Sequence, residues 1–270
     1  MTDIRIGTSG YDYLDWAGTF YPSELPRKQF LSYYSQQFDT LELNFTYYKM
    51  PTRKQLGLMA STTGKHMDFS IKANESMTHK VDYNIWESTV REFLTAIEPL
   101  RQDDRLSAVL FQFPYSFSYT IDNRRYLARL LSAMDNTPSV VEFRNAQWIN
   151  QRVFNALKER NSGYCITDMP HLRGLPPSVD MVTAPVSYIR FHGRNEKNWW
   201  GSDAARRFDY LYSETELHSW VSRIRTLLTQ SDKLRVFFNN HRKGQAAANA
   251  MMLKYLIMKS VISGEIGDEK

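Results

Sequence analysis

Residues 186–194, VSYIRFHGR, show most clearly the strand pattern from which the fold of this chain can be predicted. Side chains along a β-strand alternate between its two faces. Tyr188, Arg190 and His192 therefore share one face, and the apolar residues between them share the other. The apolar face predicts a covering layer of helices, and the polar face predicts a guanidinium and an imidazole at the carboxyl end of the strand.

The same pattern of a short strand that ends in polar residues recurs along the chain. The other expected strands cover residues 4–8, 40–44, 68–72, 107–113, 139–143, 163–168 and 234–240. The expected helices cover residues 26–38, 52–62, 85–100, 123–134, 153–160, 214–229 and 245–262. Alternating strands and helices indicate an α/β protein with parallel strands.

Eight strands that alternate with helices or covering loops match a closed (β/α)₈ barrel of the TIM type. An open, doubly wound sheet is the alternative fold, and it usually carries a glycine-rich phosphate turn after its first strand. Here that turn reads GTSGYDY, residues 7–13, and does not fit GxGxxG. The sequence therefore favours the barrel and contains no motif for a nucleotide cofactor.

Length and composition predict one domain over residues 1–270, with a frayed tail at 263–270. The chain is 42% hydrophobic and has 34 basic and 29 acidic residues, which gives a net charge of +5. This mixed charge permits nucleic-acid binding without requiring it. A single cysteine, Cys165, excludes an internal disulfide framework and fits a reducing compartment. Since no leader or membrane span is recognisable, we expect a soluble, cytoplasmic protein.

Polar residues gather at the carboxyl ends of the expected strands, where the reacting groups of (β/α)₈ barrels lie. They are Thr8, Glu42, Asn44, Lys72, Gln112, Glu142, Arg144, Asp168, Arg190, His192, Asn239 and Asn240. Ion pairs that merely close the barrel would explain any one of these residues. The whole set predicts a functional site, because charged side chains are seldom buried without a partner.

Five of these residues are candidates for catalysis: Glu42, Lys72, Glu142, Asp168 and His192. Glu142 or Glu42 is the expected general base, and His192 or Lys72 the expected proton donor or electrophile. Lys72 can alternatively form a Schiff base. A salt bridge from Lys72 to Glu42 or Glu142 is its more ordinary role.

Cations around the same opening predict an anionic substrate, because arginine grips phosphate and carboxylate groups in a bidentate manner. The expected substrate-binding residues are Asn44, Arg144, Arg190, Gly193, Arg194, Asn239 and Asn240. The loops HGRNEKN and NNHRKGQ, residues 192–198 and 239–245, add a glycine-containing corner beside the start of the closing helix. We therefore expect an enzyme, hydrolase- or isomerase-like, that acts on a small molecule carrying phosphate or carboxylate.

Two other function classes remain open. Glu42, Glu142, Asp168 and His192 can together hold a divalent metal in a hydrolase or nuclease, although no HxxxH or HxH spacing supports this cofactor. A non-catalytic nucleic-acid binder would instead stack bases on the N-terminal aromatic residues, such as Tyr11 and Tyr13, and on Trp199 and Trp200. The two tryptophans lie in the long connection 195–212, which also fits a lid. The sequence does not indicate the oligomeric state.

The motifs also carry a family resemblance. The segments in question are IGTSGYDYLDWAGTFYP, TLELNFTYY, FSIKAN, FQFP, VEFR, TDMP, YIRFHGR and FFNN. In this order, from Ile4 to about Ile257, the chain resembles the YecE-like family, domain of unknown function 72. The resemblance implies a (β/α)₈ barrel with a polar rim but no particular reaction. Tyr11 departs from the family pattern, which is expected to have tryptophan there.

Overall fold

The computed structural model describes residues 3–262, and eight parallel strands form its centre. The strands are β1 (Asp3–Thr8), β2 (Thr40–Leu43), β3 (Asp68–Lys72), β4 (Leu106–Gln112), β5 (Ser139–Glu142), β6 (Gly163–Asp168), β7 (Val186–Phe191) and β8 (Lys233–Phe238). They follow the order β1-β8-β7-β6-β5-β4-β3-β2, and a parallel bridge from Ser9 to Glu42 links the two ends of this order. The sheet thus closes on itself, which confirms the predicted single-domain (β/α)₈ barrel.

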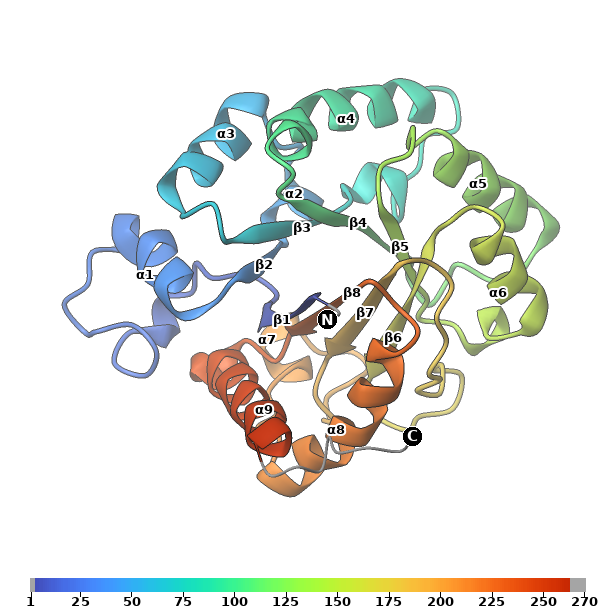
Figure 1. Ribbon diagram of the computed structural model, residues 1–270. Helices are drawn as coiled ribbons and strands as arrows, with labels where there is room; N and C mark the ends of the chain where they lie inside the picture. Colours follow the sequence, from blue (N-terminus) through green and yellow to red (C-terminus); the bar gives the residue numbers. More distant parts are fainter. Residues whose placement is uncertain (1–2, 263–270) are drawn as a thin grey trace.

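The helices form a ring around the strands (Figure 1). They are α1 (Phe30–Gln37), α2 (Phe45–Tyr48), α3 (Arg53–Thr62), α4 (Trp86–Gln102), α5 (Ile121–Ser132), α6 (Gln151–Lys158), α7 (Ala204–Arg207), α8 (Glu214–Leu228) and α9 (Gln245–Ile262). The four-residue helices α2 and α7 were not expected from the sequence, because one turn is too short to show a periodic pattern. Residues 169–185, between β6 and β7, cover the barrel as a loop without a helix.

Tyr34 of α1 joins the two strands at which the barrel closes. Its hydroxyl accepts a hydrogen bond from the Thr8 backbone N–H at 2.9 Å and donates one to the Thr40 carbonyl oxygen at 3.1 Å. The hydroxyl therefore stands in for a direct strand-to-strand hydrogen bond between β1 and β2. Gly7 allows this close approach, because a Cβ there would meet the Thr40 carbonyl oxygen.

The two faces of each strand pack against different parts of the protein, as the alternation in residues 186–194 predicts. Ile189 and Phe191 of β7 belong to the large apolar core between the strands and the helices. Tyr188 points the other way, into a small cluster inside the barrel that also contains Cys165. Burial raises the pKa of the Cys165 thiol well above its usual value, which agrees with a small core residue rather than a nucleophile.

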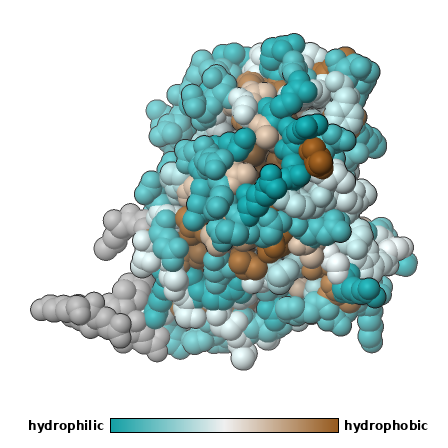
Figure 2. Space-filling view, turned by 90° about the vertical axis from the view of Figure 1, so that its right-hand side faces the viewer, coloured by the Kyte–Doolittle hydropathy of each residue, from teal (hydrophilic) through white to brown (hydrophobic). Residues whose placement is uncertain are grey.

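The outer surface carries the polar side chains of the helices. The α5–α6 side of the molecule, seen in Figure 2, is mainly hydrophilic with smaller hydrophobic areas between the polar groups. None of the helices within residues 3–262 combines the length and the hydropathy of a membrane-spanning segment. The predicted frayed tail, 263–270, lies outside the described residues.

Candidate active site

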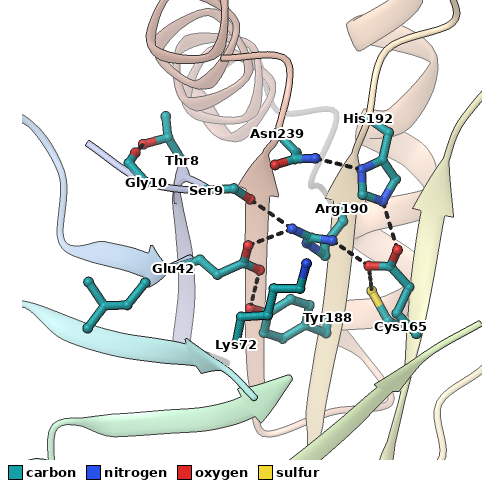
Figure 3. A network of polar contacts seen from close by, with 12 residues as sticks. Thr8, Ser9, Gly10, Glu42, Lys72, Cys165, Tyr188, Arg190, His192 and Asn239 are labelled. Atoms are coloured by element: carbon teal, nitrogen blue, oxygen red, sulfur yellow. Dashed lines mark hydrogen bonds and ion pairs between the residues drawn. The ribbon is translucent and has the colours of Figure 1, made fainter. Parts of the chain in front are cut away.

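Arg190 of β7 is the centre of a buried ionic network inside the carboxyl end of the barrel (Figure 3). Its Nη2 donates to Oε1 of Glu42 at 2.7 Å, and its Nη1 donates to Oε2 of Glu142 at 2.6 Å. All three side chains are almost completely inaccessible to solvent. Two carboxylates around one guanidinium satisfy the rule that a buried charge needs a partner, so the network is fixed in place.

Glu42 is engaged through both of its oxygens. Besides the contact with Arg190, its Oε2 accepts a hydrogen bond from the hydroxyl of Tyr188 at 2.7 Å. The Ser9 hydroxyl lies 3.4 Å from Nη2 of Arg190 and extends the network to the end of β1. Glu42 therefore has little freedom to take a proton from a substrate.

Glu142, at the end of β5, holds two further groups in position. Its Oε1 accepts from Nε of Arg144 at 2.5 Å and lies 3.1 Å from Nε2 of His192. Burial raises the pKa of Glu142, but Arg144, Arg190 and His192 together keep that pKa well below its usual value. The carboxylate thus stays ionised and orients the two arginines.

His192 is a neutral member of this network. Asn239 contacts its Nδ1 at 3.1 Å through the side-chain amide nitrogen, and Nε2 faces Glu142. These two contacts place the ring proton on Nε2. Burial and then the positive charge of Arg144 lower the pKa of His192 to about 3. The ring is therefore uncharged at neutral pH and acts as a link between β5, β7 and β8.

A cavity of ≈ 800 Å³ opens above the network at the carboxyl end of the strands. Five of the predicted site residues line it: Asn44, Lys72, Arg144, Arg190 and Asn239. Three others, Glu42, Glu142 and His192, are fully buried among residues that line the cavity. The structure thus brings together eight of the twelve residues that the sequence assigned to catalysis or substrate binding, and Gln112 of the wider set of strand ends also lines the cavity.

Lys72, the last residue of β3, lines this cavity without an ionic partner. Within residues 3–262 its amine makes no hydrogen bond or ion pair, and Figure 3 draws no contact from it to the network. The nearest aromatic group is the ring of Tyr47, whose centroid lies 4.2 Å from Nζ. The expected salt bridge from Lys72 to Glu42 or Glu142 is therefore wrong.

The electrostatic surroundings of Lys72 favour its neutral form. Burial is the largest cause, and the nearby charge of Arg190 adds to it, whereas Glu142 and Glu42 oppose it. Together these effects lower the pKa of the amine to about 7. An amine that is half neutral at physiological pH can transfer a proton or attack a carbonyl group.

His79 lies on the same side of the cavity. Its ring packs edge-on against Tyr47, with 4.9 Å between the ring centroids, and its Nδ1 contacts the Thr78 hydroxyl at 2.9 Å. Burial and then the charges of Lys72 and Arg144 lower the pKa of His79 to about 4. His79 is thus a neutral imidazole that is positioned for proton transfer in the cavity.

The long connection 195–212 forms one wall of the cavity. Trp199 is buried and its ring lies 5.5 Å from the guanidinium carbon of Arg144. Trp200 remains half exposed and packs edge-on against Tyr115. Arg207, at the end of α7, also lines the cavity, so this connection adds both aromatic surface and positive charge.

Asp168 does not reach the cavity, which corrects the prediction for this residue. It follows Tyr164 and Ile166 on the outward face of β6. Its two oxygens accept hydrogen bonds from Arg194 at 2.8 and 2.6 Å, and the Tyr212 hydroxyl and the Trp220 indole complete its shell. Asp168 fastens the loop after β7 and helix α8 to the barrel.

In the glycine-containing loops 192–198 and 239–245, the groups predicted to bind an anion are hydrogen-bonded to other parts of the protein. Arg194 pairs with Asp168 and Glu216, and the Gly193 backbone N–H donates to the Tyr212 hydroxyl at 2.9 Å. The side chain of Asn240 points outward and donates to the Tyr210 carbonyl oxygen and to Asn249, at 2.8 and 2.9 Å. The predicted anion-binding roles of Gly193, Arg194 and Asn240 therefore find no support in the geometry.

The proposed metal ligands are likewise engaged elsewhere. Glu42 and Glu142 accept from arginines, and Asp168 faces away from them. Across the described part of the chain, no three or more histidine, cysteine or acidic side chains lie grouped to hold a metal ion. The geometry of these side chains therefore gives no support to the predicted divalent-metal site.

Sequence reasoning missed much of the aromatic lining. Tyr13, one of the N-terminal aromatic residues expected to stack on bases, lines the cavity, and so do Tyr47, Tyr115, Phe208 and His241, which the prediction did not include. Most of them follow strands β1, β2, β4 or β7 as part of the connecting loop. Aromatic residues placed soon after several barrel strands were the available signal, because those loops surround the mouth of the barrel.

Comparison with known proteins gives a consistent result. The family model described as "Protein of unknown function DUF72" matches residues 5–265. The UPF0759 protein YunF of Bacillus subtilis (strain 168) is 27% identical over 269 residues, which cover 94% of this chain and 94% of that protein.

Solved structures extend the similarity to three dimensions. A DUF72 family protein from Thermotoga maritima MSB8 matches with a TM-score of 0.87 and 36% identity, over 95% of this chain and 99% of that chain. A DUF72 family protein from Enterococcus faecalis V583 matches with a TM-score of 0.84 and 24% identity, over 94% of this chain and 95% of that chain. The second match supports the fold alone.

Proposed function

The chain belongs to the DUF72 family of proteins of unknown function, and from its cavity we propose that it is an enzyme acting on a small polar molecule with a phosphate or carboxylate group. The observation that carries this proposal is the oriented guanidinium of Arg144 at the cavity. Its Nε is held by Glu142, while Nη1 makes no hydrogen bond within residues 3–262. A guanidinium held in this way is preorganised to bind an anion.

The charges around the cavity support the same conclusion. Lys72, Arg144, Arg190 and Arg207 line it, and Asp203 is the acidic side chain among the lining residues. Glu42 and Glu142 lie beneath and offset part of this positive charge. The remaining positive potential draws an anion toward the cavity.

Lys72 is the group that we assign to acid–base chemistry in this enzyme. Its amine lines the cavity, whereas Glu42 and Glu142 have both oxygens engaged. We therefore move the general base from the glutamates to Lys72 and treat the glutamates as positioning residues. A well-placed group of this kind contributes about 10²–10⁴-fold to rate.

Thermal unfolding in the presence of anions tests the binding half of the proposal. Inorganic phosphate and a panel of sugar phosphates and carboxylates should raise the melting temperature, and Arg144→Met should remove that rise. Arg129→Met is the matched control, since Arg129 lies on the outer surface of α5 and pairs with Glu87. If the native chain and Arg144→Met respond equally to every anion, Arg144 is not the binding group and the proposal fails.

A nucleic-acid strand is the second candidate ligand, because three exposed aromatic rings surround the mouth of the cavity. Tyr48, Tyr115 and Trp200 are 74%, 44% and 50% exposed. Exposed rings of this kind can stack on bases. Retention of single-stranded DNA or RNA that weakens steeply with salt, and that is lost in Trp200→Ala, would favour this candidate. If neither single-stranded DNA nor RNA is retained at low salt, the small anionic molecule remains the favoured ligand.

A further inference from the structure

We propose that Lys72 is a covalent catalytic residue that forms a Schiff base with an aldehyde or ketone group of the anionic substrate. The proposal rests on the proposed function, because Arg144 and Arg190 are the groups that bring an anion to this cavity. It goes further by naming a carbonyl group as the second feature of the substrate, and an imine as the intermediate.

The position of Lys72 meets the geometric requirement for this chemistry. A Schiff-base lysine needs an amine that is accessible to the substrate and is not consumed by an ion pair. The Lys72 side chain lines the cavity and points toward Arg190 in Figure 3, without a hydrogen bond to any described residue. Two guanidinium groups beside it oppose a further positive charge, so a neutral amine is available at neutral pH.

The contrast with surface lysines is large. With a pKa of about 7, roughly half of the Lys72 amines are neutral at pH 7. An exposed lysine with a pKa of about 10.4 has roughly one neutral amine in 2,500. Lys72 therefore carries about 1,000 times more of the nucleophilic form than a lysine with that reference pKa.

The step balances without any oxidant or reductant. The lone pair of Lys72 Nζ bonds to the carbonyl carbon, and the carbonyl π electrons move to the oxygen. Nζ then loses two protons, which leave with that oxygen as water, and a C=N bond remains. His79 can carry these protons, because its ring packs on Tyr47 as Lys72 does, and its Nε2 makes no hydrogen bond within residues 3–262. Once protonated, the C=N group withdraws electrons from an adjacent C–H or C–C bond, which is chemistry of the lyase or isomerase type.

Reductive trapping tests the proposal without knowledge of the substrate. The native protein is incubated at pH 7 with glyoxylate, a small aldehyde that carries a carboxylate, and with sodium cyanoborohydride, which delivers hydride to the imine carbon. Peptide mapping by mass spectrometry then gives the labelling rate of each lysine. We expect Lys72 to be labelled about 100-fold faster than Lys54. Lys72→Met and Lys72→Arg should lose the fast label, and circular dichroism confirms that each variant is folded.

A neutral aldehyde separates this proposal from the proposed function. Glycolaldehyde is similar in size to glyoxylate but carries no charge, so Arg144 should favour glyoxylate by about tenfold or more. Arg144→Met should remove this preference, because it removes the charge that distinguishes the two aldehydes. Equal labelling of Lys72 by both aldehydes in the native protein would contradict the proposal that the substrate is an anion, but it would still support a Schiff base at Lys72. Labelling of Lys72 no faster than that of Lys54 would overturn the Schiff base, whatever the anions do to thermal stability.

Discussion

Replacing Lys72 by methionine should stabilise the protein at neutral and acidic pH. Methionine keeps an unbranched apolar stem of similar length but carries no charge. In the native chain, burial and the charge of Arg190 lower the pKa of Lys72 from 10.5 to about 7. Each pKa unit corresponds to 1.36 kcal/mol, so the charged amine costs up to about 5 kcal/mol. Because the amine faces an open cavity, solvent screens part of this cost, and we expect a gain of about 2–3 kcal/mol.

The sign of the pH dependence follows from the direction of this shift. Below pH 7 the amine is charged in both the folded and the unfolded chain, so the full cost destabilises the folded state. Between pH 7 and 10.5 the folded chain releases the proton first, and the cost shrinks as the pH rises. The advantage of Lys72→Met over the native chain should therefore be largest near pH 6 and fall below about 1 kcal/mol by pH 10.

Urea unfolding followed by tryptophan fluorescence at pH 6, 8 and 10 measures this difference in the free energy of unfolding. Lys54→Met provides the matched control, since it makes the same side-chain change at an exposed position on α3. A Lys72→Met variant that is no more stable than the native chain at pH 6 would refute the reasoning. So would an advantage that stays constant from pH 6 to pH 10, because then the charge of Lys72 is not its cause.

Three further substitutions test other parts of the structure. Asp168→Asn removes the buried carboxylate that holds the part-buried guanidinium of Arg194, which keeps Glu216 as its second partner, and should lower the free energy of unfolding by about 1–3 kcal/mol, while the pH 7 labelling of Lys72 by glyoxylate stays fast. Tyr34→Phe leaves the Thr8 N–H and the Thr40 carbonyl oxygen unpaired at the β1–β2 junction and should cost about 1–3 kcal/mol in urea unfolding. Glu142→Gln weakens the orientation of the two arginines and should raise the phosphate concentration needed for half of the thermal shift. The pKa of native Glu142 is held below its usual value, so this carboxylate stabilises the native chain fully at pH values above its pKa in the unfolded chain. That contribution is lost as the pH falls through its pKa in the folded chain. An unchanged phosphate response in Glu142→Gln would mean that this carboxylate does not position the binding group.

The face of the strand on which a side chain lies explains which site residues were predicted correctly from the sequence and which were not. On β7 the alternation of apolar and polar residues put Arg190 and His192 on the inner face, and the structure agrees. On β6 the same alternation groups Asp168 with Tyr164 and Ile166, which face the helices. The prediction for Asp168 failed because it used the position of the residue at the strand end and not its face.

The eight strands, the seven longer helices that cover them, the barrel that they form and the inward face of β7 could all be predicted from the sequence, because hydrophobic periodicity is a local property of the chain. The tertiary structure alone decided which charges meet. Glu42, Glu142 and Arg190 lie far apart in the sequence and come together at 2.6–2.7 Å only when β1 and β2 close the barrel. Lys72 then lies among cations and has no ionic partner within residues 3–262. No local pattern of residues predicts this, because it depends on how the neighbouring charges pair with one another in the folded barrel.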